Sequence, residues 1–357
     1  MKRKIFSFFF LFALCLPLLA ACGGRARTAD VHVFYYTYSD TYVSTVRAAL
    51  DKKLTDAGIS YQDYDSNNSQ TTQTEQVQTA VTKGAKLLVV NIVTTGSDDA
   101  ALGILSLARN AGIPVIFFNR EVSDEVVKSY DKCMFVGTDA TEAGKLQGDM
   151  IGEYLLENYE KTDLNGDGII SYVMFMGEKG NNEAIYRTRY GVENADAKLT
   201  AAGKPPLKFY DPANSDRYLA DREGKWSAQA ANEYMTTALA GYNSANKNMI
   251  ELIICNNDNM AEGAITALQS AGYNTGAEGS ITVPVFGVDA IDAAKELIRT
   301  GKMAGTVTQD GNAMAECMKK AVENALNGRS LLDNMGDYSV DEGVAKVRIH
   351  YGIYTGE

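Results

Sequence analysis

Short apolar runs alternate with longer, partly polar segments from residue 31 to the C-terminus. The apolar runs predict strands at 31–36, 60–64, 86–91, 115–119, 134–136, 170–176, 207–210, 249–255, 283–288 and 305–308. The segments between them predict helices at 42–57, 73–83, 98–111, 142–159, 182–199, 227–240, 259–271, 290–300 and 312–326. Because the strands are apolar on both faces, we expect parallel sheets covered by helices, which is an α/β fold.

The two halves of the chain carry the same alternation, and 357 residues exceed what one hydrophobic core usually holds. We therefore expect two similar α/β domains. Three short segments suit passages of the chain between them, at 137–139, at 309–311 and near 341–344. The expected division is 31–137 plus 311–344 for the first domain and 141–308 plus 348–357 for the second.

The first residues predict export. Three basic residues precede an apolar stretch at 5–21, and Leu19-Ala20-Ala21-Cys22 resembles the cleavage site of a bacterial lipoprotein. We expect a signal peptide at 1–21, a lipidated Cys22 and a tether at 22–30, which places the protein in the periplasm or on the outer face of the cytoplasmic membrane. The alternatives are an uncleaved membrane anchor and a signal peptide in which Cys22 is incidental.

The net charge excludes some classes of partner, and the cysteine content indicates whether disulfides are present. The formal net charge is −11, and an acidic surface repels nucleic acid and anionic membranes. Apart from Cys15 in the expected signal peptide and Cys22, the cysteines are Cys133, Cys255 and Cys317, an odd number, and the first two lie in or beside apolar runs. This pattern favours buried free thiols over a disulfide framework.

Polar and aromatic residues gather where the predicted strands end. In an open α/β sheet, ligands bind in the crevice outside the carboxyl ends of the strands. Hydroxyl groups of a sugar donate to carboxylates and accept from a guanidinium, and an aromatic ring accommodates the apolar face of a pyranose. The residues that suit such a ligand are Tyr36, Asp40, Tyr42, Asn91, Asn181, Glu183, Arg187, Trp226, Asn257 and Asp289.

Taken singly, each of these residues also has an explanation without a ligand. Asn and Asp are common turn residues, a Glu183–Arg187 pair is often solvated, and Trp226 suits a core. After the strand at 249–255, either Asn257 or Asp258 suits the cap of the next helix when no ligand is considered. With Asn257 assigned to a ligand, we expect Asn256 and Asp258 to be structural, with Asp258 as the candidate cap. A ligand site is therefore indicated by the convergence of several strand ends and not by any one residue.

Together these residues resemble the bacterial galactose/glucose-binding proteins, within the ribose-type family of periplasmic binding proteins. The resemblance runs from residue 31 to about residue 351, and its most specific pieces are 89–91, 117–119, 136–139, 255–258 and 284–290. It implies a type I periplasmic binding protein, with two Rossmann-like lobes that contain parallel sheets and are joined by three crossovers. Such a protein closes on one sugar like a hinged clamp.

The resemblance also implies roles for particular residues. Hydrogen bonds to the sugar fall on Asp40, Asn91, Arg187, Asn257 and Asp289, the ring is sandwiched by Tyr42 and Trp226, and Tyr36 lies near the entrance. Three positions depart from the family pattern, since Asn181 replaces a histidine, Glu183 an aspartate and Gln309 an asparagine. One extra methylene at Glu183 and Gln309 is enough to shift specificity between sugars, so the particular hexose stays open.

A run of alternating oxygen donors begins an EF-hand-like calcium loop. Asp163, Asn165 and Asp167 alternate before a glycine, and the carbonyl group of Ile169 follows. The twelfth position of the loop is not the glutamate that a complete EF-hand needs, so a simple turn explains the run equally well. The resemblance implies that Glu251 completes a structural calcium site in which Ser171 replaces a glutamine ligand, and we expect weaker calcium binding for that reason.

An enzyme is one alternative, because paired acids such as Asp40 and Asp289 could in principle hydrolyse a glycoside. Strong hydrogen bonding to each would keep both ionised and leave no proton donor, so we do not expect an enzyme. The only histidines, His32 and His350, lie in segments expected to be apolar terminal strands, and nucleophile-elbow, Walker and zinc-protease motifs are absent from the sequence. A sugar-responsive repressor would need a DNA-binding headpiece where the signal segment stands.

We therefore expect a monomeric, lipid-anchored receptor that binds a hexose and feeds the permease of an ABC transporter. The alternative is a sugar sensor that presents its closed lobes to a chemoreceptor or a membrane histidine kinase. The sequence does not separate these two uses, because both depend on the same closed shape.

Overall fold

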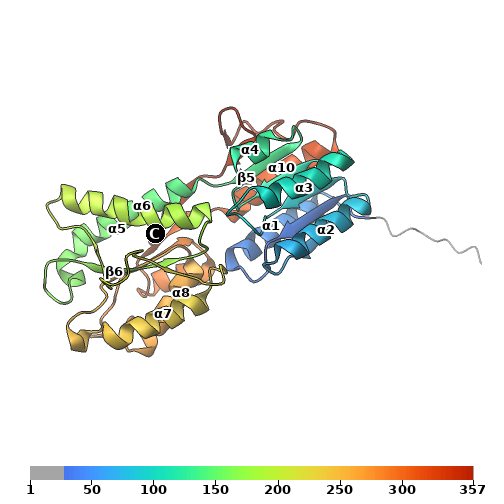
Figure 1. Cartoon of the computed structure of the whole chain (residues 1–357). Coiled ribbons are helices and arrows are strands. Elements are labelled where there is room, and N and C mark those ends of the chain that lie inside the picture. The colour runs from blue at the N-terminus through green and yellow to red at the C-terminus, as the bar shows by residue number, and fades with distance from the viewer. Residues whose placement is uncertain (1–27, 357) are drawn as a thin grey trace, which may run out of the picture.

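The computed structural model of the chain describes residues 28–356, and the predicted signal peptide and Cys22 lie outside this range. Two lobes lie side by side, each with one sheet flanked by helices (Figure 1). The predicted α/β architecture with two mostly parallel sheets is confirmed. Among the described residues, none of the helices has the length and apolar character needed to cross a membrane.

The first lobe contains a sheet with the strand order β12-β13-β5-β4-β3-β1-β2. The strands are β1 (Val31–Tyr35), β2 (Tyr61–Asp65), β3 (Leu87–Val90), β4 (Val115–Phe118), β5 (Cys133–Gly137), β12 (Ser339–Val340) and β13 (Lys346–Arg348). The helices are α1 (Thr41–Asp56), α2 (Gln70–Thr82), α3 (Asp99–Ala111), α4 (Asp124–Lys128) and α10 (Gly311–Leu326). One face of the sheet is buried against Leu50 of α1 and Met318 of α10, and the other against Val77 of α2 and Ile104 of α3.

The second lobe contains a sheet with the strand order β14-β11-β10-β9-β6-β7, and β8 also pairs with β6. The strands are β6 (Ser171–Met176), β7 (Lys208–Phe209), β8 (Leu219–Ala220), β9 (Leu252–Cys255), β10 (Val285–Asp289), β11 (Gly305–Gln309) and β14 (Tyr351–Tyr354). The helices are α5 (Ala140–Thr162), α6 (Asn182–Ala201), α7 (Ala228–Gly241), α8 (Asp258–Ser270), α9 (Asp292–Arg299) and a 3₁₀ turn at Ser244–Asn246. Only the β11–β14 pair is antiparallel, and one continuous core joins both faces of the sheet.

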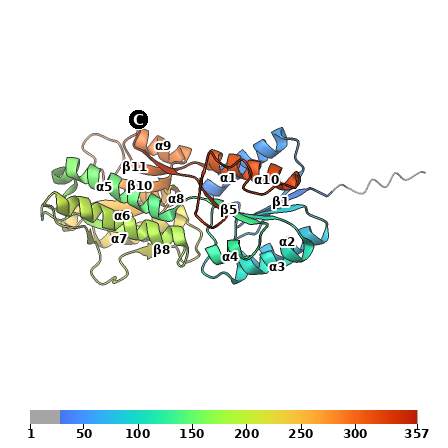
Figure 2. The same ribbon diagram turned by 90° about the horizontal axis from the view of Figure 1, so that it is seen from above.

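The chain passes between the lobes three times. The first passage follows β5 at residues 138–139, and the second follows β11 at residue 310, after which α10 packs on α1 (Figure 2). The third passage lies at residues 349–350, between β13 and β14. Our expectation of a passage near 341–344 is therefore wrong, because Val347 of β13 pairs in parallel with Val136 of β5 and belongs to the first sheet. A strand of three residues is too short to show a period of two in the sequence.

The cysteine prediction is confirmed. Cys133, Cys255 and Cys317 are free and buried in the structure. Burial raises the pKa of Cys133 and of Cys317 to about 12, so both thiols stay protonated at neutral pH. These cysteines serve as small apolar core residues.

Candidate functional site

A pocket lies where residues of both lobes meet at the ends of their strands. Ten of the eleven residues that the sequence analysis assigned to ligand binding line it, all except Asn91. The lining residues are Tyr36, Asp40, Tyr42, Val43, Asn119, Arg120, Asn181, Glu183, Arg187, Trp226, Asn257, Asp289 and Gln309. The fold thus brings into one place residues that are separated by more than 250 positions in the chain.

The wall from the first lobe is built around Asp40 at the start of α1. One carboxylate oxygen of Asp40 accepts from the backbone N–H of Val43 at 2.7 Å and so caps the helix. The other accepts from the hydroxyl group of Tyr36 at 2.6 Å. Because both oxygens already have partners, Asp40 is held in a fixed position at the edge of the pocket.

Asn91 supports this wall from behind. Its side-chain oxygen accepts from the backbone N–H of Tyr36 at 3.3 Å, and its side-chain nitrogen donates to the carbonyl oxygen of Phe118 at 3.0 Å and to Asn119 at 3.1 Å. Asn91 is fully buried and does not line the pocket. The structure therefore places it as a support for Tyr36 and Asn119, which differs from the direct contact that the resemblance implies.

Arg120 lines the pocket and was missed by the sequence analysis. Its guanidinium lies over the ring of Tyr36, 4.2 Å from the centroid, and donates to the carbonyl oxygens of Ile92 at 2.7 Å and Val93 at 2.8 Å. The same guanidinium forms an ion pair with Glu178, which follows β6 in the second lobe. Arg120 therefore links the two lobes beside the pocket.

Helix N-termini provide part of the wall from the second lobe. Asn181 caps α6 and Asn257 caps α8, since their side-chain oxygens accept from the backbone N–H groups of Ala184 at 3.2 Å and Met260 at 3.0 Å. The expectation that Asp258 caps α8 is wrong. Asp258 is fully buried and instead accepts from the hydroxyl group of Thr306 at 2.6 Å and the N–H of Ile291 at 3.0 Å.

The inner part of the pocket contains polar atoms without partners. Both carboxylate oxygens of Glu183, Nε of Arg187 and the hydroxyl group of Tyr42 are buried and make no hydrogen bond. Leaving such a group unsatisfied costs about 1–3 kcal/mol, and more for a charged group. The arrangement is therefore suited to a ligand that offers donors to Glu183 and an acceptor to Arg187.

Burial also changes the protonation of the acids in the pocket. Desolvation raises the pKa of Glu183 to about 7, although the positive charge of Arg187 acts in the opposite direction. Desolvation likewise raises the pKa of Asp289 well above its usual value, again opposed by Arg187. A hydrogen-bond donor brought in by a ligand would favour the ionised form of either carboxyl group.

Three lining residues have a left-handed backbone. The φ angles are 60° at Asn119, 55° at Trp226 and 124° at Asp289. Side chains other than glycine rarely adopt such angles, and they persist where the surrounding structure enforces them, often at binding sites. The ring of Trp226 also packs directly on Gly177, where a Cβ atom would lie 2.2 Å from it. The position of the ring thus depends on the absence of a side chain at residue 177.

Comparison with known proteins gives the family. A family model described as "Periplasmic binding protein domain" matches residues 31–330. The chain belongs to the periplasmic binding protein family. This periplasmic binding protein is 33% identical over 319 residues to the D-galactose/methyl-galactoside binding periplasmic protein of Haemophilus influenzae, covering 89% of this chain and 88% of the relative.

Solved structures of this family share the fold. An ABC transporter solute binding protein from Clostridium phytofermentans with bound β-D-glucose matches with a TM-score of 0.70 and 21% identity, over 91% of this chain and 94% of that one. A solute binding protein from Bacillus halodurans with bound myo-inositol matches with a TM-score of 0.67 and 22% identity, over 93% and 96%. These relatives are binding proteins, and the prediction that this periplasmic binding protein is not an enzyme is confirmed.

The two histidines lie outside the pocket. His32 is buried in β1, where its ring contacts the hydroxyl group of Tyr64 at 2.9 Å. His350 does not lie in a strand, in contrast to our expectation. It occupies the exposed third passage and contacts Ser339 at 2.9 Å and Glu142 at 3.3 Å.

The predicted calcium loop, 163–171, is closed by hydrogen bonds of the protein itself. The fully buried Glu251 accepts from the backbone N–H groups of Leu164 at 2.8 Å, Asn165 at 3.1 Å and Ser171 at 2.9 Å, and from the hydroxyl group of Ser171 at 3.1 Å. The side chains of Asp163, Asn165 and Asp167 accept from backbone N–H groups of the loop. Within residues 28–356, no group of three or more acids, histidines or cysteines is arranged to hold a metal ion. Calcium at this loop, with the Ile169 carbonyl as a ligand, stays a prediction.

Proposed function

We propose that this protein binds one hexose, of the galactose or glucose type, in the pocket between its lobes and delivers it to an ABC sugar importer. The observation that carries the proposal is the set of buried polar atoms without partners on Glu183, Arg187 and Tyr42, beside the ring of Trp226. An apolar ligand would leave these atoms unsatisfied. A polyhydroxylated ring provides both donors and acceptors, together with an apolar face.

The chemistry of the pocket suits hydroxyl groups at each position. Hydrogen bonds that involve a charged partner contribute roughly 1.5–3 kcal/mol, against about 1 kcal/mol for neutral pairs. Glu183 and Asp289 would accept from hydroxyl groups, Arg187 would donate, and Trp226 would support the face of the ring. After the costs of ordering and closure, we expect micromolar or tighter affinity, about −8 kcal/mol.

The ligands of relatives support a sugar or a similar polyol. The Haemophilus relative is a galactoside-binding protein, and the structural relatives include complexes with β-D-glucose, myo-inositol and D-allose. These ligands all carry several hydroxyl groups and differ in how those groups are arranged. Glu183 and Gln309 reach one methylene further than the residues of the family pattern, so we expect them to influence which ligand is preferred.

Isothermal calorimetry with D-galactose, D-glucose, D-ribose, D-xylose and myo-inositol tests the proposal. We expect the tightest binding for a hexose. Binding of pentoses alone would keep the sugar class and refute the hexose. Absence of heat with every compound, at concentrations well above micromolar, would refute the proposed function.

Delivery to an importer fits an exported, monomeric protein held at the membrane through Cys22. The anchor is tested directly by replacing Cys22 with alanine. We expect the wild-type protein to sediment with membranes and Cys22→Ala to remain in the supernatant, because the acyl chains supply the membrane affinity. Equal sedimentation of both proteins would refute lipidation at this cysteine. The sensor alternative stays a prediction, and transport assays in cells with and without the cognate permease separate it from uptake.

Glu251 provides a test of the calcium prediction. We expect Glu251→Gln to lower the free energy of unfolding by about 2 kcal/mol, because an amide N–H₂ group would face backbone donors that the carboxylate now accepts from. If calcium binds as predicted, it raises the melting temperature of the wild-type protein and not that of the variant. Identical melting curves of the wild-type protein with calcium and with EGTA would refute the prediction that calcium binds at this loop.

A further inference from the structure

Three side chains in or beside the three interlobe passages form a connected cluster next to Arg187. Thr138 lies in the first passage, Gln309 ends β11 just before the second, and Tyr351 opens β14 just after the third. Gln309 and Tyr351 are also direct partners in the β11–β14 ladder. We call Thr138, Gln309 and Tyr351 the hinge frame. All three side chains are buried, as is Arg187, which is 3% exposed.

Hydrogen bonds connect the hinge frame to Arg187. Nη2 of Arg187 donates to the hydroxyl group of Tyr351 at 2.9 Å and to the side-chain oxygen of Gln309 at 3.3 Å. The hydroxyl group of Thr138 lies 2.7 Å from that of Tyr351 and accepts from the side-chain nitrogen of Gln309 at 3.3 Å. Thr138 therefore contacts both Gln309 and Tyr351, and each of these two also contacts Arg187.

The frame takes up two of the five N–H donors of Arg187, and its Nε–H and one Nη1–H are left without a protein partner. Nη1 donates to the carbonyl oxygen of Asn256 at 2.9 Å, and Nη2 is taken up by the frame. Nε is buried and has no partner. Gln309, although it lines the pocket, uses both ends of its amide within the frame. Gln309 thus belongs to the frame as well as to the pocket lining.

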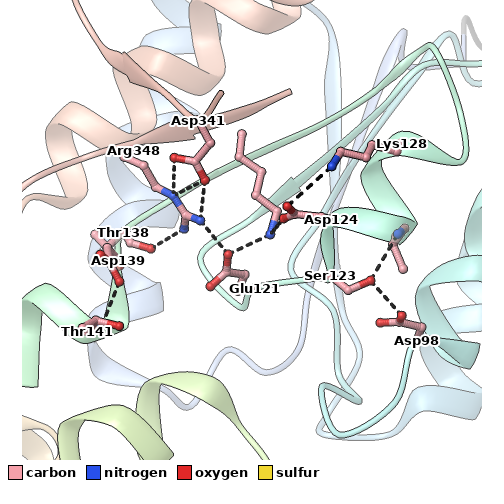
Figure 3. Close-up of polar contacts among 12 residues, drawn as sticks. Asp98, Glu121, Ser123, Asp124, Lys128, Thr138, Asp139, Thr141, Asp341 and Arg348 are labelled. Atoms are coloured by element: carbon pink, nitrogen blue, oxygen red, sulfur yellow. Dashed lines mark hydrogen bonds and ion pairs between the residues drawn. The ribbon is translucent and has the colours of Figure 1, made fainter. Parts of the chain in front are cut away.

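The frame is fixed at its outer end by a second network (Figure 3). Arg348, the last residue of β13, donates to the carbonyl oxygen of Thr138 at 2.8 Å. Arg348 also binds Glu121 at 2.7 Å and Asp341 at 2.7 Å, both of which point toward its guanidinium in Figure 3. Because Arg348 directly precedes the third passage, it ties that passage to the first one.

We propose that Thr138, Gln309 and Tyr351 are positioning residues for ligand binding, which fix the direction of the Arg187 guanidinium in the pocket. Arg187, Gln309 and Tyr351 all belong to the second lobe, and Thr138 of the first passage contacts both Gln309 and Tyr351. The frame therefore holds the guanidinium within the second lobe and connects it to the first passage. This inference rests on the proposed function, since the ligand is taken to be a hexose.

Replacing Tyr351 with phenylalanine tests the frame, because it removes one hydroxyl group and keeps the ring. We expect Tyr351→Phe to weaken the binding of D-galactose or D-glucose about tenfold, since Arg187 loses a partner that fixes its direction. The matched control is Tyr354→Phe on the same strand, outside the frame, which we expect to bind as the wild-type protein does. Equal affinity of the two variants would refute the positioning role.

A double-mutant cycle with Arg187→Lys separates positioning from general stability. Measured as the unfolding equilibrium without ligand, Tyr351→Phe and Arg187→Lys should be non-additive by roughly tenfold, because both remove the same contact. Additive effects would refute the frame, whether or not a sugar binds. If the cycle shows this coupling but the wild-type protein binds no sugar, the proposed function is refuted and the Arg187–Tyr351 contact is established. The same result would also refute the role of the frame in positioning Arg187 for a ligand.

Discussion

Arg187→Ala is expected to weaken sugar binding about 100-fold, which corresponds to about 3 kcal/mol. The guanidinium is buried beside two acids, and its Nε–H makes no hydrogen bond within the protein. Its removal takes away that donor and leaves the carboxyl groups of Glu183 and Asp289 without the positive charge that favours their ionised forms.

A neighbouring arginine provides the control for this measurement. Arg189 lies on the same helix, is exposed and pairs with Glu193 at 2.9 Å. Arg189→Ala should leave the affinity within about twofold of the wild-type value, because exposed ion pairs contribute little. Isothermal calorimetry measures the sugar affinity of both variants. A similar affinity for Arg187→Ala and Arg189→Ala would contradict the role of Arg187 in ligand binding.

Sugar affinity is expected to rise with pH through neutrality. Burial raises the pKa of Glu183 to about 7, so its carboxyl group is largely protonated at pH 6 and ionised at pH 8. The ionised form offers both oxygens to sugar hydroxyl groups. If only this form binds well, Kd is about tenfold higher at pH 6 than at pH 8, since a group with a pKa of 7 is about one-tenth ionised at pH 6.

Glu183→Gln is the control for this pH dependence. The amide does not titrate, so the variant should show a nearly constant Kd between pH 6 and pH 8, and a remaining slope would be assigned to Asp289. The unliganded protein should behave in the opposite way. A raised carboxyl pKa means that the folded state holds its proton more tightly than the unfolded state, so this group lowers stability as pH rises from about 4.5 to 7. A wild-type affinity that is independent of pH would contradict the role of Glu183.

Local patterns in the sequence were sufficient for the fold and for most of the pocket lining. Apolar runs marked the long buried strands, and the residues after them converged because parallel strands end at the same edge of a sheet. The short strand β13 was not recognised, because three residues carry no periodicity and the strand forms only by pairing with β5. Long-range pairing of this kind is not visible in a local window.

The parts of the site that were missed depend on tertiary structure in the same way. Arg120 reaches the pocket because Asn119 has a left-handed backbone and because Glu178 of the other lobe binds its guanidinium. Tyr351 and Thr138 meet only where two passages cross between the lobes. The choice of Asn257 rather than Asp258 as the cap of α8 follows from the burial of Asp258 against Thr306, which one strand end does not reveal.

The fluorescence of Trp226 tests the central claim most directly, since it is the single tryptophan of the chain and lines the pocket. Titration with D-galactose and with D-glucose should produce a saturable change in emission, with a midpoint in the micromolar range or below for at least one of them. Arg187→Ala should shift that midpoint about 100-fold to higher concentration. A folded wild-type protein whose emission does not respond to any hexose, pentose or inositol would contradict the assignment of this pocket to sugar.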